Sequence, residues 1–184
     1  MQIEFQILDW IQSIRTPFLD VVMQFFTTLG NAGIIWIVLT AGLLLYPKTR
    51  KYGVAVALAL CVDALVCNGI LKNLFCRIRP CDVRQTVALL ISRPHDFSFP
   101  SGHTAASFAV VSALFFEGDR KWCKWLLPLA VVIAFSRLYL YVHYPTDVLG
   151  GVLVGIAAGY SGFLLEKVIM KRIALSKEKR GRLE

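Results

Sequence analysis

The chain has 184 residues, a length that suits one domain, and 57% of them are hydrophobic while only 17% are charged. That balance, with a mean hydropathy of +0.62, excludes an ordinary soluble domain and favours a membrane protein. The net charge of +8 invites a nucleic-acid partner, but the basic residues follow membrane topology, so no nucleic acid is expected. The sequence predicts a single all-α domain over residues 1–184, a polytopic membrane bundle of about six transmembrane helices.

The N-terminal residues 1–16 carry Glu4 and Asp9, and no basic segment precedes an apolar run. They therefore predict an interfacial segment rather than a cleaved signal peptide. The next stretch, Pro17 to Leu29, is short and rather polar, which leaves two alternatives: a short or tilted span, or a half-buried helix. Five longer apolar stretches follow, several near the roughly 20 residues that a spanning helix needs: Ile34 to Tyr46, Val54 to Leu71, Thr104 to Phe116, Trp125 to Tyr141 and Val148 to Leu165.

Basic residues between these stretches predict the orientation, because cytoplasmic loops carry an excess of Lys and Arg. They occur in two short loops and in the tail of residues 167–184: Lys48, Arg50 and Lys51, then Arg120, Lys121 and Lys124, then Lys167, Lys171, Arg172, Lys177, Lys179, Arg180 and Arg182. We therefore expect a multi-pass protein of the plasma membrane with a cytoplasmic tail that contacts anionic headgroups. Residues 75–101 then form an extracytoplasmic loop.

Cys76 and Cys81 lie in that loop, where they could form a disulfide if the compartment is oxidising or could remain two free thiols. In the last apolar stretch Gly151, Gly155 and Gly159 recur every four residues along one helical face. Such a face favours close helix packing within the chain, with a dimer interface as the alternative. The oligomeric state stays open.

Three cations precede or end apolar stretches on the predicted outer side. Lys72 stands seven positions before Arg79, two helical turns, so both side chains lie on one side if the helix after Leu71 continues. Arg137 is the third, and an ordinary interfacial position is its alternative. Cations converging at a membrane edge need an anion between them, and phosphate suits bidentate Arg.

The run Pro100-Ser101-Gly102-His103 precedes an apolar helix. Ser101 is a candidate N-cap, Gly102 would let an oxygen approach the backbone, and free N–H groups of the first turn would point at an anion. His103 in the same turn could give a proton to a leaving oxygen. The alternative is a capped helix start with no chemistry.

Pro145 suits the first turn of the last helix, which puts Asp147 near the helix start and His143 just before it. An aspartate that accepts the Nδ1 proton would leave Nε2 of His143 free as a nucleophile. A structural histidine and a helix-capping aspartate are the alternative.

The combined pattern, Lys72-x6-Arg79-Pro80, then Pro100 to His103, then Ser136-Arg137-x5-His143-x3-Asp147, resembles the three-part signature of the type 2 phosphatidic acid phosphatase (PAP2) superfamily. That superfamily shares its core with vanadium haloperoxidases and bacterial class A acid phosphatases. The resemblance implies catalytic roles for three residues: His143 is a nucleophile that forms a phosphohistidine, Asp147 orients it, and His103 is the general acid. It also implies that the phosphoryl oxygens are bound by Lys72, Arg79, Ser101, Gly102 and Arg137.

The resemblance further implies a metal-independent reaction without a cofactor, in agreement with the lack of a metal-ligand pattern in the sequence. We expect an enzyme of the bilayer that removes a terminal phosphate from a lipid phosphate or pyrophosphate. The compact chain resembles undecaprenyl pyrophosphate phosphatases, and phosphatidylglycerophosphate or phosphatidic acid are alternative substrates. A protein that binds or transports lipid phosphates without cleaving them is an alternative of another class. A soluble vanadate-dependent peroxidase is disfavoured by the apolar spans.

Overall fold

The computed structural model describes residues 2–181, and every regular element in that range is a helix, which confirms the all-α prediction. The elements in chain order are α1 (Gln2–Ser13), α2 (Pro17–Leu29), the 3-10 turn η1 (Asn31–Gly33), α3 (Ile34–Leu45), α4 (Arg50–Asp63), the π-helix η2 (Ala64–Leu71), α5 (Lys72–Phe75), α6 (Pro80–Val83), α7 (Gly102–Phe116), α8 (Arg120–Tyr139) and α9 (Pro145–Gly181). The end of the predicted basic tail, residues 182–184, lies outside the described residues.

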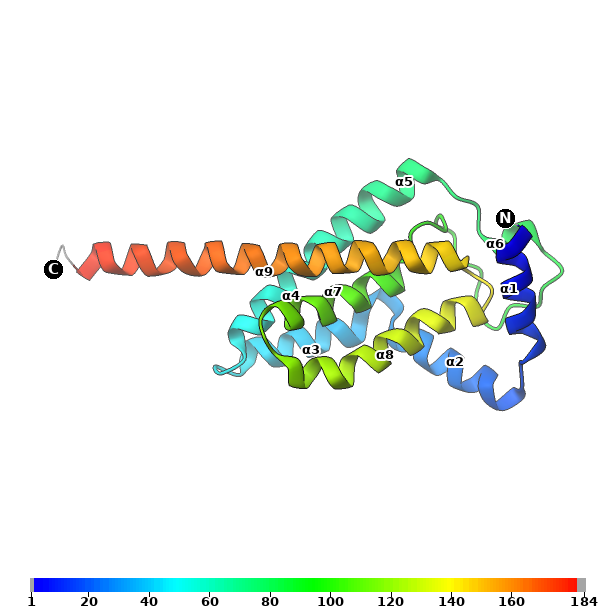
Figure 1. Cartoon of the computed structure of the whole chain (residues 1–184), viewed down its shortest axis with the longest axis horizontal. Coiled ribbons are helices and arrows are strands. Elements are labelled where there is room, and N and C mark those ends of the chain that lie inside the picture. Colours follow the sequence, from blue (N-terminus) through cyan, green and yellow to red (C-terminus); the bar gives the residue numbers. More distant parts are fainter. Residues whose placement is uncertain (1, 182–184) are drawn as a thin grey trace.

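Helix α7 is the centre of the bundle, with α3, α4, α8 and α9 packed around it (Figure 1). Its most extensive contact is with α9, because the glycines of α9 let the two backbones approach closely. A Cβ placed on Gly155 would lie 2.5 Å from the carbonyl oxygen of Ala105, and one on Gly159 would lie 2.7 Å from that of Ala109. The glycine face is therefore occupied within the chain.

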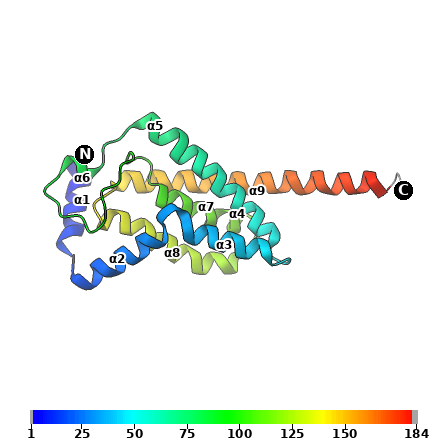
Figure 2. The same cartoon turned by 180° about the vertical axis from the view of Figure 1, so that it is seen from behind.

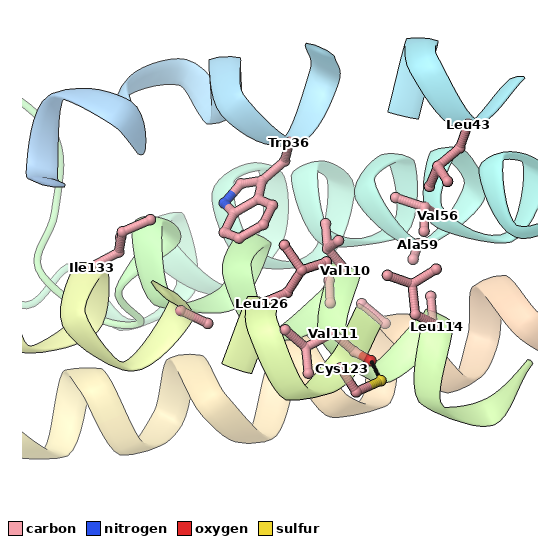
Figure 3. Packing of buried hydrophobic residues seen from close by; sticks show 14 residues of the cluster. Trp36, Leu43, Val56, Ala59, Val110, Val111, Leu114, Cys123, Leu126 and Ile133 are labelled. Atoms are coloured by element: carbon pink, nitrogen blue, oxygen red, sulfur yellow. Dashed lines mark hydrogen bonds between the residues drawn. The ribbon is translucent and has the colours of Figure 1, made fainter. Parts of the chain in front are cut away.

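The largest apolar cluster joins α3, α4, α7 and α8 around this central helix, and Figure 3 shows its side chains interdigitating. Trp36 of α3 is almost fully buried there, and its indole Nε1 donates a hydrogen bond of 3.1 Å to the hydroxyl of Ser107. An indole N–H without a partner in such a core would be costly. The pair therefore fixes how α3 crosses α7.

Helices α2 and α3 form a bent pair rather than two independent elements. Ala32 and Gly33 adopt positive φ angles of 50° and 68°, and the two helices are bent by 47° at this break. By length and composition three helices of the described chain can cross a membrane, or four if the bent pair is one span, and α7 is a shorter apolar helix. The six predicted apolar stretches correspond to the bent pair α2 and α3, the helix that begins at Arg50, the shorter α7, α8 and α9.

The chain is helical without a break from Arg50 to Phe75, and then the helix ends at Cys76, whose φ is 45°. The helix therefore does not continue to Arg79, so Lys72 and Arg79 do not share a helical face. Arg79 instead stands at the N-cap of the short helix α6. The two side chains still converge, because the loop folds back over the end of the bundle.

Several of the elements that build the site gather at one end of the bundle. Helix α1, α6 and the loop up to residue 101 gather there, at the end where α8 stops and α7 and α9 begin (Figures 1 and 2). The other end of α9 projects well beyond the remaining helices (Figure 1).

The five cysteines are free thiols, with Cys76 exposed and Cys81 buried, so the structure holds the free-thiol alternative.

Candidate functional site

His143 lies in the short connection between α8 and α9, and it is completely enclosed, with an exposed fraction of 1%. The connection turns sharply because Tyr141 adopts a φ of 60°, in the left-handed region that non-glycine residues seldom occupy. Pro145 then begins α9, as the sequence predicts, and places Asp147 in its first turn. This turn brings the imidazole Nδ1 to 3.5 Å from Oδ2 of Asp147, slightly too long for a normal hydrogen bond.

The other nitrogen of the imidazole faces a cation. Nη1 of Arg79 lies 3.1 Å from Nε2 of His143, and a guanidinium can only donate. Nε2 must therefore accept, which leaves the proton on Nδ1, toward Asp147. This is the tautomer that an attacking Nε2 requires.

Burial lowers the pKa of His143 to about 3, with Asp147 opposing the shift and the cations of Arg79 and Arg137 adding to it. An imidazole with such a pKa is neutral at pH 7. The ring is therefore in the unprotonated form at Nε2 before any ligand arrives.

Asp147 is itself fully buried and is held by several donors. Its Oδ2 accepts hydrogen bonds from the hydroxyl of Ser98 at 2.5 Å and from the backbone N–H of Tyr144 at 2.8 Å. Its Oδ1 accepts a hydrogen bond of 2.5 Å from Nη1 of Arg77. With both oxygens so engaged, the carboxylate is fixed relative to the helix start.

Lys72 and Arg79 are both buried, and both bind the carboxylate of Asp96, whose side chain is 53% exposed. Lys72 pairs with Oδ2, while Nη2 of Arg79 lies 2.7 Å from Oδ1 and its Nε donates to the Asp96 carbonyl at 2.8 Å. Burial would raise the pKa of Asp96, but the hydrogen bonds and charges of Lys72 and Arg79 outweigh it and lower that pKa. An anion of the protein itself therefore joins two of the cations predicted to bind phosphate.

Arg137, near the end of α8, is buried to 3% exposure, so the interfacial alternative is wrong for this residue. It donates to the hydroxyl of Thr27 in α2, and its Nε has no hydrogen-bond partner among the described residues. A buried guanidinium with an unused donor is a candidate ligand for an oxyanion.

His103 lies in the first turn of α7, with Nε2 3.0 Å from the side-chain oxygen of Asn31. A Cβ on Gly30 would come within 2.7 Å of the His103 ring, so a glycine is needed at the α2–α3 break for the histidine to fit. On the other side of the turn, a Cβ on Gly102 would lie 3.0 Å from the Asn68 oxygen and 3.7 Å from Nζ of Lys72. Gly102 thus keeps open the space between α7 and the cation.

Ser101 occupies the predicted N-cap position of α7, but its side chain does not cap the helix. It is fully buried, and its oxygen accepts a hydrogen bond of 3.0 Å from Thr104. Ser136 is also buried and donates to the Ile133 carbonyl, the local role that its position allows. Neither hydroxyl faces the cavity described next.

A cavity of about 230 Å³ unites most of the predicted site residues. The predicted residues that line it are Lys72, Arg79, Gly102, His103, Arg137 and His143. A second cavity of about 350 Å³ adjoins it and shares Lys72, Asp96, Gly102 and His103. Residues from four helices and two loops thus meet at one polar pocket that continues into a larger, more apolar one.

Several residues at the site carry no signal in the sequence. Asp96 and Ser98 lie in the loop before α7, Thr27 in the last turn of α2 and Asn31 at the α2–α3 break, and they meet the motifs only through the folded chain. Arg77, in the loop that follows α5, also lies outside the recognised motif positions. Among residues 2–181 no group of three His, Cys, Asp or Glu side chains comes close enough to hold a metal ion.

The chain was compared with known proteins, and a sequence profile of the PAP2 superfamily matches residues 48–170. The chain is 35% identical to the undecaprenyl-diphosphatase of Sulfolobus acidocaldarius over 74% of its own length, but it spans only 66% of that relative. It is 30% identical to the lipid A 4'-phosphatase of Bacteroides thetaiotaomicron, over 94% of this chain and 79% of that protein.

A solved structure gives the same result in three dimensions. The first transmembrane PAP2-type phosphatidylglycerolphosphate phosphatase from Bacillus subtilis superposes with a TM-score of 0.71 and 30% identity, over 94% of this chain and 86% of that one. At this level of identity the likeness extends beyond the fold to the family. Since the profile covers more than half of the chain and each of these relatives is at least 30% identical to it, the chain belongs to the PAP2 superfamily and is a membrane lipid phosphatase of that superfamily.

Proposed function

We propose that the protein removes a terminal phosphate from a lipid phosphate or pyrophosphate through a phosphohistidine on His143. The observation that carries this proposal is the buried, neutral imidazole whose Nε2 faces the cavity while Nδ1 faces Asp147. A histidine with a purely structural role would need neither this tautomer nor cations around its unprotonated nitrogen, to which Arg79 donates. The reaction proceeds in two displacements.

In the first displacement Nε2 of His143 attacks phosphorus as the bond to the leaving oxygen breaks, and His103 gives that oxygen a proton. In the second, water attacks the phosphohistidine, His103 takes a proton from it, and inorganic phosphate leaves. Lys72, Arg79 and Arg137 hold the equatorial oxygens, where charge builds up in the transition state. The phosphoryl group must take over the Arg79 and Lys72 contacts that Asp96 makes in the free protein.

The two adjoining cavities support a lipid leaving group on one side. An in-line displacement puts the nucleophile and the leaving oxygen on opposite sides of phosphorus. His143 lines only the smaller cavity, whereas His103 lines both. The larger cavity, with Ile37, Leu60 and Ala106 in its wall, therefore lies on the leaving-group side and suits the part of a lipid next to its phosphate.

Among lipids we place undecaprenyl pyrophosphate first, giving undecaprenyl phosphate and inorganic phosphate. A relative of this chain is named for that reaction. Phosphatidylglycerophosphate and phosphatidic acid come next, because a similar solved structure is a phosphatidylglycerolphosphate phosphatase. We also propose that the site faces the outer side of the plasma membrane and that residues 167–184 face the cytoplasm, on the distribution of basic residues.

The test is phosphate release by the purified protein in detergent with EDTA present, on these three lipids, for the native chain and His143→Ala. We expect at least a 10³-fold lower kcat for the variant, since removing a nucleophile leaves only the effects of binding and charge. His95→Ala is the control, because His95 is the third histidine of the chain and is exposed on the outer loop.

Unchanged hydrolysis by His143→Ala would exclude the phosphohistidine. Lipid-phosphate binding by the native protein, without release of phosphate from any lipid, would favour the binding or transport alternative. A phosphorylated native protein trapped by rapid quenching, absent in the variant, would identify the intermediate directly.

A further inference from the structure

Arg77 is the one cation of the outer loop that contacts the catalytic carboxylate directly. Its Nη1 lies 2.5 Å from Oδ1 of Asp147 and 2.6 Å from the hydroxyl of Thr146. Its guanidinium carbon also stacks 4.0 Å from the ring centre of Tyr144, the residue whose N–H binds the other carboxylate oxygen. Arg77 thus contacts Tyr144, Thr146 and Asp147, three of the four residues from 144 to 147 at the start of α9.

The N-terminal helix α1 holds Arg77 from its far side. Nη2 donates to both carboxylate oxygens of Glu4, at 3.0 and 2.8 Å, and the Thr146 hydroxyl donates to Glu4 as well. Burial would raise the pKa of Glu4, but Thr146 and Arg77 outweigh it and lower that pKa, so Glu4 is ionised at neutral pH. The edge of the Phe5 ring packs on Tyr144, with 5.5 Å between centres, which closes the contact.

We propose that Arg77, oriented by Glu4 of α1, is a positioning residue that fixes Asp147 against His143. The charges of Glu4, Arg77 and Asp147 alternate in sign along a chain of contacts that ends at the neutral imidazole of His143. Through Glu4, the N-terminal helix α1 thus helps to position Asp147 and is more than an interfacial segment. The inference rests on the proposed function, because the protonation of His143 affects the rate only if His143 is the nucleophile.

The direction in which Arg77 and Glu4 shift the pKa of His143 follows from the charges around the imidazole. Arg79 faces the ring from the outer loop, Arg137 from α8, His103 from α7 and Asp147 from α9, with Asp96 beyond Arg79. Arg77 adds a positive charge behind Asp147, which weakens the attraction of that carboxylate for an imidazolium. Glu4 partly cancels this charge. Removing Arg77 must therefore raise the pKa of His143, and removing the charge of Glu4 must lower it.

A second ion pair of α1 provides the matched control. Asp9 pairs with Arg84, which stacks 4.2 Å from the Phe5 ring centre, and Asp9 also accepts from the hydroxyl of Tyr141. This pair ties the same helix to the same loop, but among the described residues it contacts neither Asp147 nor His143. Arg84→Gln and Asp9→Asn therefore loosen α1 without altering the charge behind the carboxylate.

The experiment measures kcat and KM against pH for Arg77→Gln, Arg77→Lys, Glu4→Gln and the two control variants. The acid limb of the pH profile of kcat reports the pKa of the nucleophile in the enzyme–substrate complex. The negative charge of the bound phosphate raises the pKa of His143 there into a measurable range. We expect this limb to move up by about one pH unit for Arg77→Gln and down by about half a unit for Glu4→Gln, from one charge at several ångströms in a partly buried site. Arg77→Lys keeps the charge and should keep the limb, while its kcat falls because one ammonium cannot replace the fork.

We expect kcat of Arg77→Gln to fall at least tenfold with KM changed less than threefold, since Arg77 does not line the phosphate cavity. The inference is overturned if Arg77→Gln and Glu4→Gln move the limb in the same direction, or no further than Arg84→Gln and Asp9→Asn do. His143→Ala is assayed beside them. If it retains hydrolysis, the proposed function fails, whereas stationary limbs with an inactive His143→Ala overturn the positioning role alone.

Discussion

Asp96 puts a carboxylate between Lys72 and Arg79, in the place where a phosphate would join the same two cations. Buried cations without an anion would pay a large desolvation cost, so an internal counter-ion stabilises the empty site. Because the Asp96 side chain is half exposed, it can turn toward solvent when a phosphoryl group arrives. Because phosphate must displace Asp96, the site binds phosphate more weakly than the cations would without this carboxylate.

Asp96→Asn should therefore strengthen binding of phosphate analogues. We expect the inhibition constant of orthovanadate to fall about tenfold, equivalent to about 1.4 kcal/mol, because a neutral amide competes less well for Lys72 and Arg79. Asp82→Asn is the control, since Asp82 is in the same outer segment but pairs with Arg93. An unchanged or higher inhibition constant for Asp96→Asn, measured by steady-state inhibition, would refute the competition.

At the scale of single elements, the contact between α7 and α9 determines where both histidines of the proposed active site lie. The two helices start beside each other, since the Ser101 N–H donates to the Asp147 carbonyl at 3.0 Å. Their separation depends on glycines of α9 that face the α7 backbone. A side chain there has no room, because the nearest atoms are backbone oxygens, backbone nitrogens and Cβ atoms rather than the ends of flexible side chains.

Gly155→Ala should destabilise the protein by about 1–3 kcal/mol through overpacking. Its Cβ would meet the Ala105 oxygen at 2.5 Å and the Ala109 nitrogen at 3.0 Å. The control is Gly42→Ala in α3, where a Cβ meets nothing within 4 Å. Thermal unfolding in detergent should give a clearly lower midpoint for the first variant and an equal or higher one for the second; equal midpoints for both would contradict the packing argument.

Two turns at the site escaped prediction because their residues give no warning in the sequence. Cys76 ends α5 and Tyr141 ends the α8 turn, both with positive φ and neither a glycine or asparagine. Such conformations persist only where surrounding contacts enforce them. They direct Arg77 and His143 toward Asp147, whereas the simple continuation of the helix after Leu71 would have carried Arg77 and Arg79 away.

At the scale of the whole molecule, the site lies at one end of the bundle and the projecting part of α9 at the other (Figure 1). If the basic residues orient the chain as proposed, the membrane separates Cys76 from Ser176. Both are exposed, Cys76 beside the outer loop and Ser176 near the end of α9.

In intact cells a membrane-impermeant maleimide should label a variant that keeps only Cys76, with the other cysteines replaced by alanine. A variant without native cysteines but with Ser176→Cys should be labelled only after permeabilisation, because charged reagents do not cross the bilayer. The reverse pattern would invert the proposed orientation and put the site on the cytoplasmic side.

The sequence by itself determined the helical membrane fold, the start of α9 at Pro145 and the three clusters that a cavity later unites. These features depend on local composition and spacing: apolar length sets a span, and proline sets a helix start. The bend between the first two apolar segments was not predicted, because it depends on the backbone at Ala32 and Gly33.

Only the tertiary structure decided which charges meet. Asp96 reaches Lys72 across 24 positions, and Glu4 reaches Arg77 across 73. Ion pairs of this kind leave no periodic pattern, since their partners are chosen by how the outer loop and α1 fold over the end of the bundle. The motifs could therefore be found in the sequence. The carboxylates that orient Arg77 or compete with phosphate for Lys72 and Arg79, namely Glu4 and Asp96, could not.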